Sequence, residues 1–347
     1  MKIKILIVLF VIISLWGIGY SQNQKVFTFD EAFNIALQNN KDLLSAKISL
    51  DNAGLEYENK KKDPTTLTLA LKQAELNYKL EAVRYENTKL QVMQNVRTAY
   101  FNVLEAQSQV KLYKKQLEYY SEYLNATKIK FELGNATSVD VQQAEINYYS
   151  AQNSLTSAEN NLEIAWSQFW QVLGVFPMKD VVLQELELKV FNLDLEKLFD
   201  IAQENLSSIV QAKNNVELYE MQVKLYDNDY TPKATLISAK NSLETAKMTL
   251  EQTLTSTRLS LAQKIEQVRA ALKEVNLQRK NLDLAQENYR IAKIRYDAGL
   301  ITKLDLINSE VNIIKAENSY YSSLHNYWKS LDSLLLSIGK VVVGEEK

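Results

Sequence analysis

Hydrophobic side chains recur at every seventh position along two long stretches of the chain. This period predicts helices that pack side by side as in a left-handed coiled coil, although the core of an ordinary helical bundle carries the same pattern. The two series are Val96, Val103, Val110, Leu117, Leu124 and Phe131, and then Leu261, Val268, Val275, Leu282, Tyr289 and Tyr296. Both series end at the same distance before a glycine, which favours the coiled-coil interpretation.

The second series belongs to a copy of the segment that holds the first. When the sequence is shifted by 165 positions, residues 126–174 align with residues 291–339 without a gap. A duplicated unit of this length predicts a protomer with two similar halves, because the repeats of solenoid proteins have much shorter periods. The identical pairs include Gly134 with Gly299, Thr137 with Thr302, Asp140 with Asp305, Glu145 with Glu310, and Gly174 with Gly339.

Residues that break helices are scarce, so both halves are expected to consist of long helices. The whole chain has eight glycines and three prolines. At roughly 1.5 Å per residue, the longest expected helix would measure about 100 Å. Two shorter helices laid end to end nearly match it, which predicts a hairpin-like rod in each half. The expected helices span residues 29–39, 42–62, 66–131, 138–173, 195–203, 207–229, 234–296 and 303–338.

The first residues have the pattern of a signal peptide. Two lysines precede an apolar run and a small-residue cleavage site, so cleavage is expected before Gln22, with an uncleaved N-terminal anchor as the alternative. The chain is therefore divided into a signal peptide (1–21), a first repeat (22–180), a non-helical connector (181–194) and a second repeat (195–347). The absence of cysteine excludes a lipid-modified cysteine at a processed N-terminus, and it also excludes disulfides.

Charge and candidate chemistry argue against several functions. The formal net charge is −2, and no basic stripe is interleaved with aromatic residues, so no nucleic-acid partner is expected. His325 is the single histidine, and we interpret it as a polar helix residue rather than a catalytic base or a ligand. The sequence has no phosphate-binding glycine loop, nucleophile elbow or metal-ligand spacing. It therefore predicts no catalytic residue, metal or cofactor.

Four motifs resemble the TolC-like outer membrane efflux proteins. The entry motif of that family is similar to FTFDEAFNIALQNNKDLLSAK at 27–47, and a degenerate copy is LEKLFDIAQENLSSIVQAK at 195–213. The paired turns of the family resemble FELGNATSVDVQQAE at 131–145 and YDAGLITKLDLINSE at 296–310. Two copies of each motif in the right order extend the resemblance over nearly the whole mature chain.

The resemblance implies a homotrimer whose protomers close a hollow α-helical barrel across the periplasm. It implies two further partners, a periplasmic adaptor (membrane fusion protein) and an inner-membrane transporter, within an efflux or type I secretion system. In the family, two membrane-spanning strands per half continue the tube as a β-barrel, but residues 65–71 and 232–238 leave no room for them. The expected fold class is therefore all-α, with internally duplicated long antiparallel helical hairpins and little or no β-barrel. Association with the outer membrane stays open.

The two glycine turns are the candidate functional sites. A left-handed glycine can end a helix, a threonine can cap the next helix, and an aspartate in its first turn complements the helix dipole. The residues concerned are Gly134, Thr137, Asp140, Gly299, Thr302 and Asp305. These structural roles explain them fully, whereas the resemblance implies that the turns also dock the adaptor. It further makes Asp305 an aperture candidate, together with Asn308 and Gln143, which occupy the position of the family's second acidic residue.

Two other classes of protein stay open as alternatives to a conduit. The main rival is a periplasmic coiled-coil scaffold or adaptor without a pore, although a typical adaptor would carry a lipoyl-like β domain with glycine-rich turns, which is missing here. A helical enzyme is the third class, and the absence of a recognisable site disfavours it.

Overall fold

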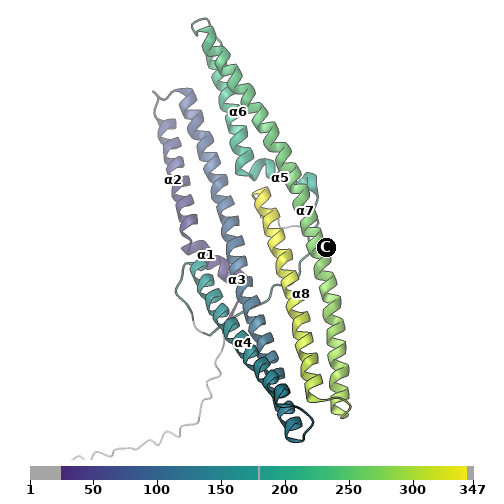
Figure 1. Cartoon of the computed structure of the whole chain (residues 1–347). Helices are drawn as coiled ribbons and strands as arrows, with labels where there is room; N and C mark the ends of the chain where they lie inside the picture. The colour runs from purple at the N-terminus through teal and green to yellow at the C-terminus, as the bar shows by residue number, and fades with distance from the viewer. Residues whose placement is uncertain (1–24, 179, 342–347) are drawn as a thin grey trace, which may run out of the picture.

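The computed structural model describes residues 25–178 and 180–341, so the expected signal peptide lies outside the described residues. The molecule is elongated and almost entirely helical (Figure 1). Its elements are β1 (Lys25–Phe27), α1 (Phe29–Asn39), α2 (Lys41–Lys62), α3 (Thr68–Glu132), α4 (Ser138–Leu173), β2 (Val181–Leu183), α5 (Leu195–Asn205), α6 (Ser207–Tyr226), α7 (Lys233–Asp297) and α8 (Lys303–Ile338).

The two halves repeat the same arrangement, which confirms the predicted all-α, duplicated hairpin fold. The long helices α3 and α7 each have 65 residues, about 97 Å at the usual helical rise. Along α3 lie α2 at one end and α4 at the other, and along α7 lie α6 and α8 in the same way (Figure 1). The short helices α1 and α5 sit where these stacked pairs meet.

The helices lie side by side in one row. The order across the row is α4 with α2, then α3, then α8 with α6, and finally α7. The α3·α8 packing joins the two halves, while α4 and α7 form the outer edges. No helix in the described part of the chain has an apolar stretch long enough to cross a bilayer.

The predicted helix boundaries agree with the structure to within two or three residues. The largest difference is at α6, which ends at Tyr226 rather than at residue 229. The reason is Asn228, whose Oδ1 accepts hydrogen bonds from the backbone N–H groups of Tyr230 and Thr231 at 2.9 and 3.0 Å. An asparagine side chain that captures these donors competes with the helix and ends it early.

We call the two seven-residue series of hydrophobic side chains the heptad seam. Its side chains are buried in the middle of the molecule and become exposed toward the glycine turns. Val96, Val103 and Val110 are buried, whereas Phe131 at the end of the same series is 46% exposed. The copy in α7 behaves alike, because its first three members are buried and its last, Tyr296, is 36% exposed. The long hairpins therefore carry apolar surface that a single protomer does not cover.

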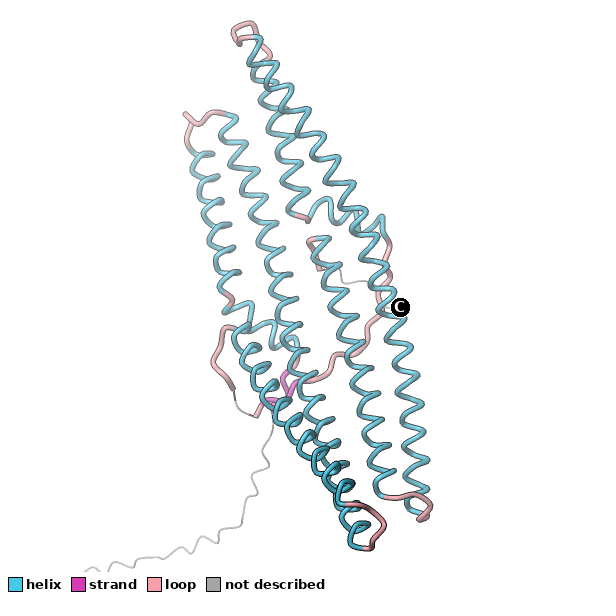
Figure 2. The backbone as a smooth tube through the Cα atoms, in the orientation of Figure 1, coloured by secondary structure: helices cyan, strands magenta, loops and turns pink. Residues whose placement is uncertain are grey.

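Two short strands and the connector cross the helices near mid-length, a level that we call the equator. β1 and β2 pair in parallel, with Val26 opposite Val182 and Phe27 opposite Leu183. This pairing was not predicted. From β2 the connector crosses the row of helices toward α7 (Figure 2). The core is richest in aromatic rings here, where the buried side chains are Phe27, Tyr100, Phe101, Phe169, Trp170, Tyr327 and Trp328.

Candidate functional site

The two predicted glycine turns lie at the same end of the molecule (Figure 1). Gly134 and Gly299 have φ angles of 76° and 72°, the left-handed region that ends a helix at low cost only for glycine. In the second turn, the backbone N–H of Leu300 donates to the carbonyl of Arg295 at 2.8 Å. A carbonyl left free by the end of α7 is thereby satisfied.

Each returning helix begins with a capping box. Thr137 Oγ1 accepts from the Asp140 backbone N–H at 3.2 Å, and Asp140 Oδ2 accepts from the Thr137 N–H at 2.7 Å. Thr302 and Asp305 repeat both bonds at 3.2 and 2.9 Å. Hydrogen bonds from the neighbouring threonine hold the pKa of both aspartates below the usual value, so both are ionised at neutral pH.

The structure brings the three predicted residues of each turn together but keeps the two turns on separate hairpins. An ion pair from Lys303 Nζ to Glu122 Oε1, at 2.6 Å, ties the second turn to α3. The other two aperture candidates lie near the starts of α4 and α8. Gln143 is exposed and donates to Asn147 Oδ1 at 3.3 Å, while Asn308 is exposed on α8.

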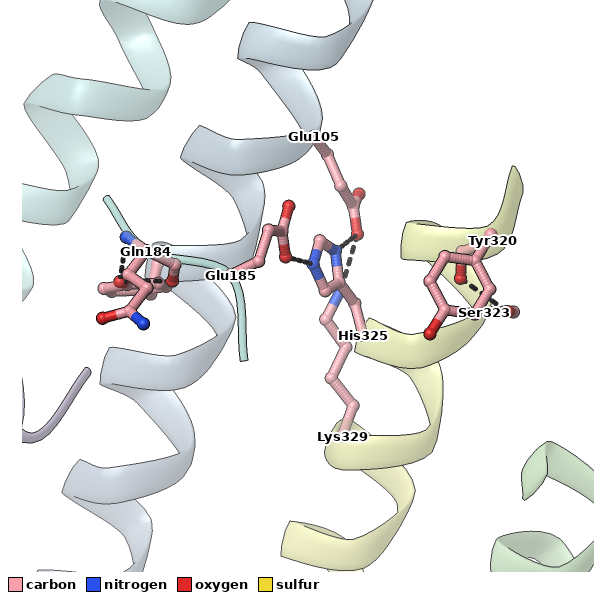
Figure 3. A network of polar contacts seen from close by, with 8 residues as sticks. Glu105, Gln184, Glu185, Tyr320, Ser323, His325 and Lys329 are labelled. Atoms are coloured by element: carbon pink, nitrogen blue, oxygen red, sulfur yellow. Dashed lines mark hydrogen bonds and ion pairs between the residues drawn. The ribbon is translucent and has the colours of Figure 1, made fainter. Parts of the chain in front are cut away.

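A second polar site, which was not predicted, lies at the equator. His325 on α8 is 1% exposed, and its ring stacks on Phe101 at 4.1 Å between centroids. Its Nδ1 lies 2.9 Å from Glu105 Oε1 on α3, and its Nε2 lies 3.0 Å from Glu185 Oε2 on the connector. Figure 3 shows the imidazole held between the two carboxylates, with Lys329 close to Glu105. We call His325, Glu105 and Glu185 the histidine clamp.

The geometry of the clamp favours the charged form of His325. Ionised carboxylates only accept hydrogen bonds, so between two of them both ring nitrogens of His325 would donate, and only the imidazolium has two N–H groups. Burial lowers the pKa of His325, but the hydrogen bonds and charges of Glu105 and Glu185 outweigh this and raise it. Burial likewise raises the pKa of Glu105, and His325 with Lys329 overcomes this and lowers it. The interpretation of His325 as a merely polar helix residue was therefore incomplete.

A buried ion pair lies about two turns further along α8. Arg97 Nη1 on α3 donates to Asp332 Oδ1, and the guanidinium lies 4.4 Å from the ring centre of Phe29 and 4.9 Å from that of Trp328. Burial raises the pKa of Asp332 to about 6, despite the opposing charge of Arg97. Three buried polar atoms lack a hydrogen-bond partner within the described residues, namely Arg97 Nε, Asp332 Oδ2 and Trp328 Nε1.

Neutral hydrogen bonds fasten the connector on both sides of the clamp. Tyr100 Oη donates to the Gln184 carbonyl at 2.7 Å and accepts from its N–H at 2.8 Å. Tyr327 Oη donates to the Lys189 carbonyl at 2.7 Å. Further along, Arg269 Nη2 donates to the carbonyl of Leu193 at 3.3 Å. The connector is thus attached to α3, α8 and α7 in turn.

The equatorial groups left one signal in the sequence. They occur in a single copy, because the repeat equivalents of His325 and Arg97 are Asn160 and Ala262. A residue that can be charged in one repeat and is small or neutral in the other can indicate a contact that only one half of the chain makes. Among the described residues no group of three or more His, Asp or Glu side chains is arranged to hold a metal ion.

These features define a class of protein, the elongated, internally duplicated helical protomer seen in solved outer membrane channels. The structure is similar to the CmeC channel of Campylobacter jejuni, with a TM-score of 0.67 and 15% identity over 90% of this chain and 85% of that chain. It is also similar to VceC of Vibrio cholerae, with a TM-score of 0.65 and 14% identity over 90% and 96% of the two chains. At these identities the likeness shows the fold.

The chain belongs to the outer membrane efflux protein family, whose model matches residues 65–175 and 212–340. The TolC-like resemblance is thus confirmed, and the family is one of transport proteins of the cell envelope. TolC of Escherichia coli K12 is 25% identical over 223 residues, which are 63% of this chain and 43% of that protein. TolC of Salmonella enteritidis is 26% identical over 161 residues, 45% and 32% of the two chains. The match therefore spans less than half of these relatives.

Proposed function

We propose that this protein is one subunit of a homotrimeric conduit that passes substrates across the cell envelope in an efflux or type I secretion system. It performs no covalent chemistry, and an inner-membrane transporter supplies the energy. The repeat units 22–180 and 195–347 form the wall. Family membership supports the transport role, and the arrangement of exposed apolar side chains supports the assembly of copies.

The observation that carries the proposal is a buried cluster whose repeat equivalents are exposed. Leu112 on α3 packs with Val311 and Ile314 on α8, and all three are at most 9% exposed. Shifting each by 165 positions gives Leu277 on α7, and Ile146 and Tyr149 on α4. These equivalents are 52%, 61% and 61% exposed.

The exposed equivalents lie on the two outer edges of the row of helices. If α7 of one copy packs on α4 of the next as α3 packs on α8 within one copy, the same cluster forms between subunits. The within-copy seam also holds an ion pair from Lys115 to Glu310 at 2.8 Å, whose repeat equivalents are Lys280 and Glu145. Such head-to-tail contact closes into a ring when a whole number of equal rotations from one copy to the next adds up to a full turn. The family resemblance supports three copies.

The remaining partners follow from the free end of the hairpins. The six turn residues named above are proposed to dock the periplasmic adaptor. In a threefold ring, Asp305 would be present three times near one axis, where like charges focus a negative potential. Asn308 and Gln143 would flank this ring without adding charge.

The test is the mass of the purified mature protein in detergent and without it, combined with two substitutions on α7. Leu277→Asp buries a charge in the proposed seam and should give monomers. Ile294→Asp is the matched control, because Ile294 and its repeat equivalent Ile129 are both exposed, at 55% and 57%, so neither belongs to a seam. A charge swap offers a second arm, since Lys280→Glu should weaken the assembly and adding Glu145→Lys should restore it.

A wild-type protein that is monomeric under all these conditions, or a trimer that Leu277→Asp leaves intact, would overturn the proposal. A stable monomer would favour the scaffold without a pore. Electron microscopy of the wild-type assembly should show a central hole.

A further inference from the structure

We propose that the histidine clamp is a proton-controlled fastening of the connector, closed when His325 is an imidazolium and released when it is neutral. The clamp ties the connector to the α3·α8 seam, the packing that joins the two halves of the protomer. This inference uses contacts within one chain, so it does not depend on the proposed trimer.

The first step is the number of protons. Neutral histidine has one N–H, so after deprotonation it can donate to Glu105 or to Glu185 but not to both. The other carboxylate then faces a lone pair of the buried ring at about 3 Å, an arrangement that costs free energy. Glu105 keeps a second cation, because Lys329 Nζ lies 3.7 Å from its Oε1. The carboxylate released is therefore that of Glu185.

The second step is the set of charged and titratable groups around the ring. From α3 comes Glu105 and from the connector comes Glu185, while α8 itself contributes Lys329 beside Glu105 and Tyr321 within the field of Glu185. The helices α5 and α7 also pack on α8 but contribute no group to the pKa shift of His325. The two carboxylates are thus the groups that hold the proton on the ring.

The third step is the direction of the pH effect. The pKa of His325 is raised in the folded protein, whereas unfolded histidine has a pKa of about 6.5. The stabilisation from the clamp is therefore fully present below about pH 6.5 and is lost as the pH rises through the higher folded-state pKa. Mild alkali, not acid, is expected to loosen the connector.

The fourth step is what moves. The hydrogen bonds from the hydroxyls of Tyr100 and Tyr327, which we call the neutral pins, hold the connector at Gln184 and Lys189. Glu185 lies next to the first pin, and its side chain is 30% exposed, so it can swing into water once the imidazolium loses its proton. Residues 185–188 would then bow away from the α3·α8 seam between the two pins.

Because the chain has a single histidine, selective ¹³C labelling gives one imidazole signal. The protein should carry a tag without histidine. We expect this signal to titrate above pH 6.5 in the wild type and at lower pH in Glu185→Gln. An imidazole that titrates at or below pH 6.5, or one that Glu185→Gln leaves unchanged, would overturn the proposal. This measurement on the wild type does not require any clamp variant to fold.

The release of the connector can be measured by amide hydrogen exchange of residues 184–192 between pH 6 and pH 9, with the rates corrected for base catalysis. With one proton controlling closure, protection should fall by up to about tenfold per pH unit between about pH 6.5 and the raised folded-state pKa of His325, and it should level off above that pKa. His325→Gln should show low protection that does not change with pH. Tyr327→Phe is the matched control, because it removes a neutral pin and should lower protection equally at every pH. Flat protection in the wild type, or the wild-type slope in His325→Gln, would refute the clamp.

Discussion

Replacing the glycines that end helices with alanine should cost very different amounts of stability, in an order set by their surroundings. Gly299, Gly174 and Gly339 all have φ near 70°, so each loses roughly 1–2 kcal/mol from backbone strain when a Cβ is added. At Gly299 that Cβ would meet no atom within 4 Å. At Gly174 it would lie 3.0 Å from the backbone oxygen of Asn39.

Gly339 is the extreme case. Its Cβ would lie 2.1 Å from the backbone oxygen of Asn205, a contact that the α5–α6 junction can relieve only by moving. That movement would break the hydrogen bonds of Asn87 Nδ2 to the carbonyls of Asn205 and Gly339, at 2.9 and 3.2 Å. Leaving such half-buried groups unpaired costs about 1–3 kcal/mol in addition to the strain. We therefore expect a total of about 2–5 kcal/mol for Gly339→Ala.

Urea unfolding followed by circular dichroism, at one protein concentration for all variants, measures the differences. The expected order of destabilisation is Gly299→Ala below Gly174→Ala below Gly339→Ala. Because all three share the left-handed strain, differences among them report the neighbouring atoms. Equal losses at the three positions would show that backbone strain alone matters and that the close approach at Gly339 is easily relieved.

Two further predictions concern acidic groups. Asp305→Asn should weaken block of the reconstituted channel by cations, while Asp140→Asn, which removes the same type of cap from the other turn, serves as its control; unchanged block in Asp305→Asn would refute the acidic aperture. Asp332, whose pKa burial raises to about 6 from about 3.8, should make a contribution to stability that declines as the pH rises from 4 to 6. Melting temperatures across this range should therefore rise more steeply with pH in Asp332→Asn than in the wild type, and parallel curves would contradict the assignment.

Most of the fold could be predicted because its determinants are local. The duplicated turns at Gly134 and Gly299, the capping threonines and the seven-residue period fix where helices begin, end and face. The α6 boundary was missed because the capture of two N–H groups by Asn228 is a geometric competition that hydrophobic periodicity does not register. The strands β1 and β2 were missed because each has three residues and its partner lies more than 150 positions away.

The contacts of the equatorial site could not be predicted from sequence, although the difference between the repeats singles out His325 and Arg97. His325 lies 220 positions from Glu105 and 140 from Glu185, so no spacing rule connects them. Nothing in the sequence next to His325 indicates that a connector will cover it. The caps of the glycine turns were predictable for the opposite reason, since all their hydrogen bonds join residues three positions apart.

The connector appears once per chain, although the helical hairpins appear twice. A closed ring of such chains would therefore contain two alternating kinds of boundary between neighbouring hairpins, one strapped by a covalent tether and one held by side-chain packing alone. Under an outward load the strapped boundaries would resist, and the unstrapped ones would part first. The tube would then widen at one boundary per polypeptide, and not at every boundary between hairpins.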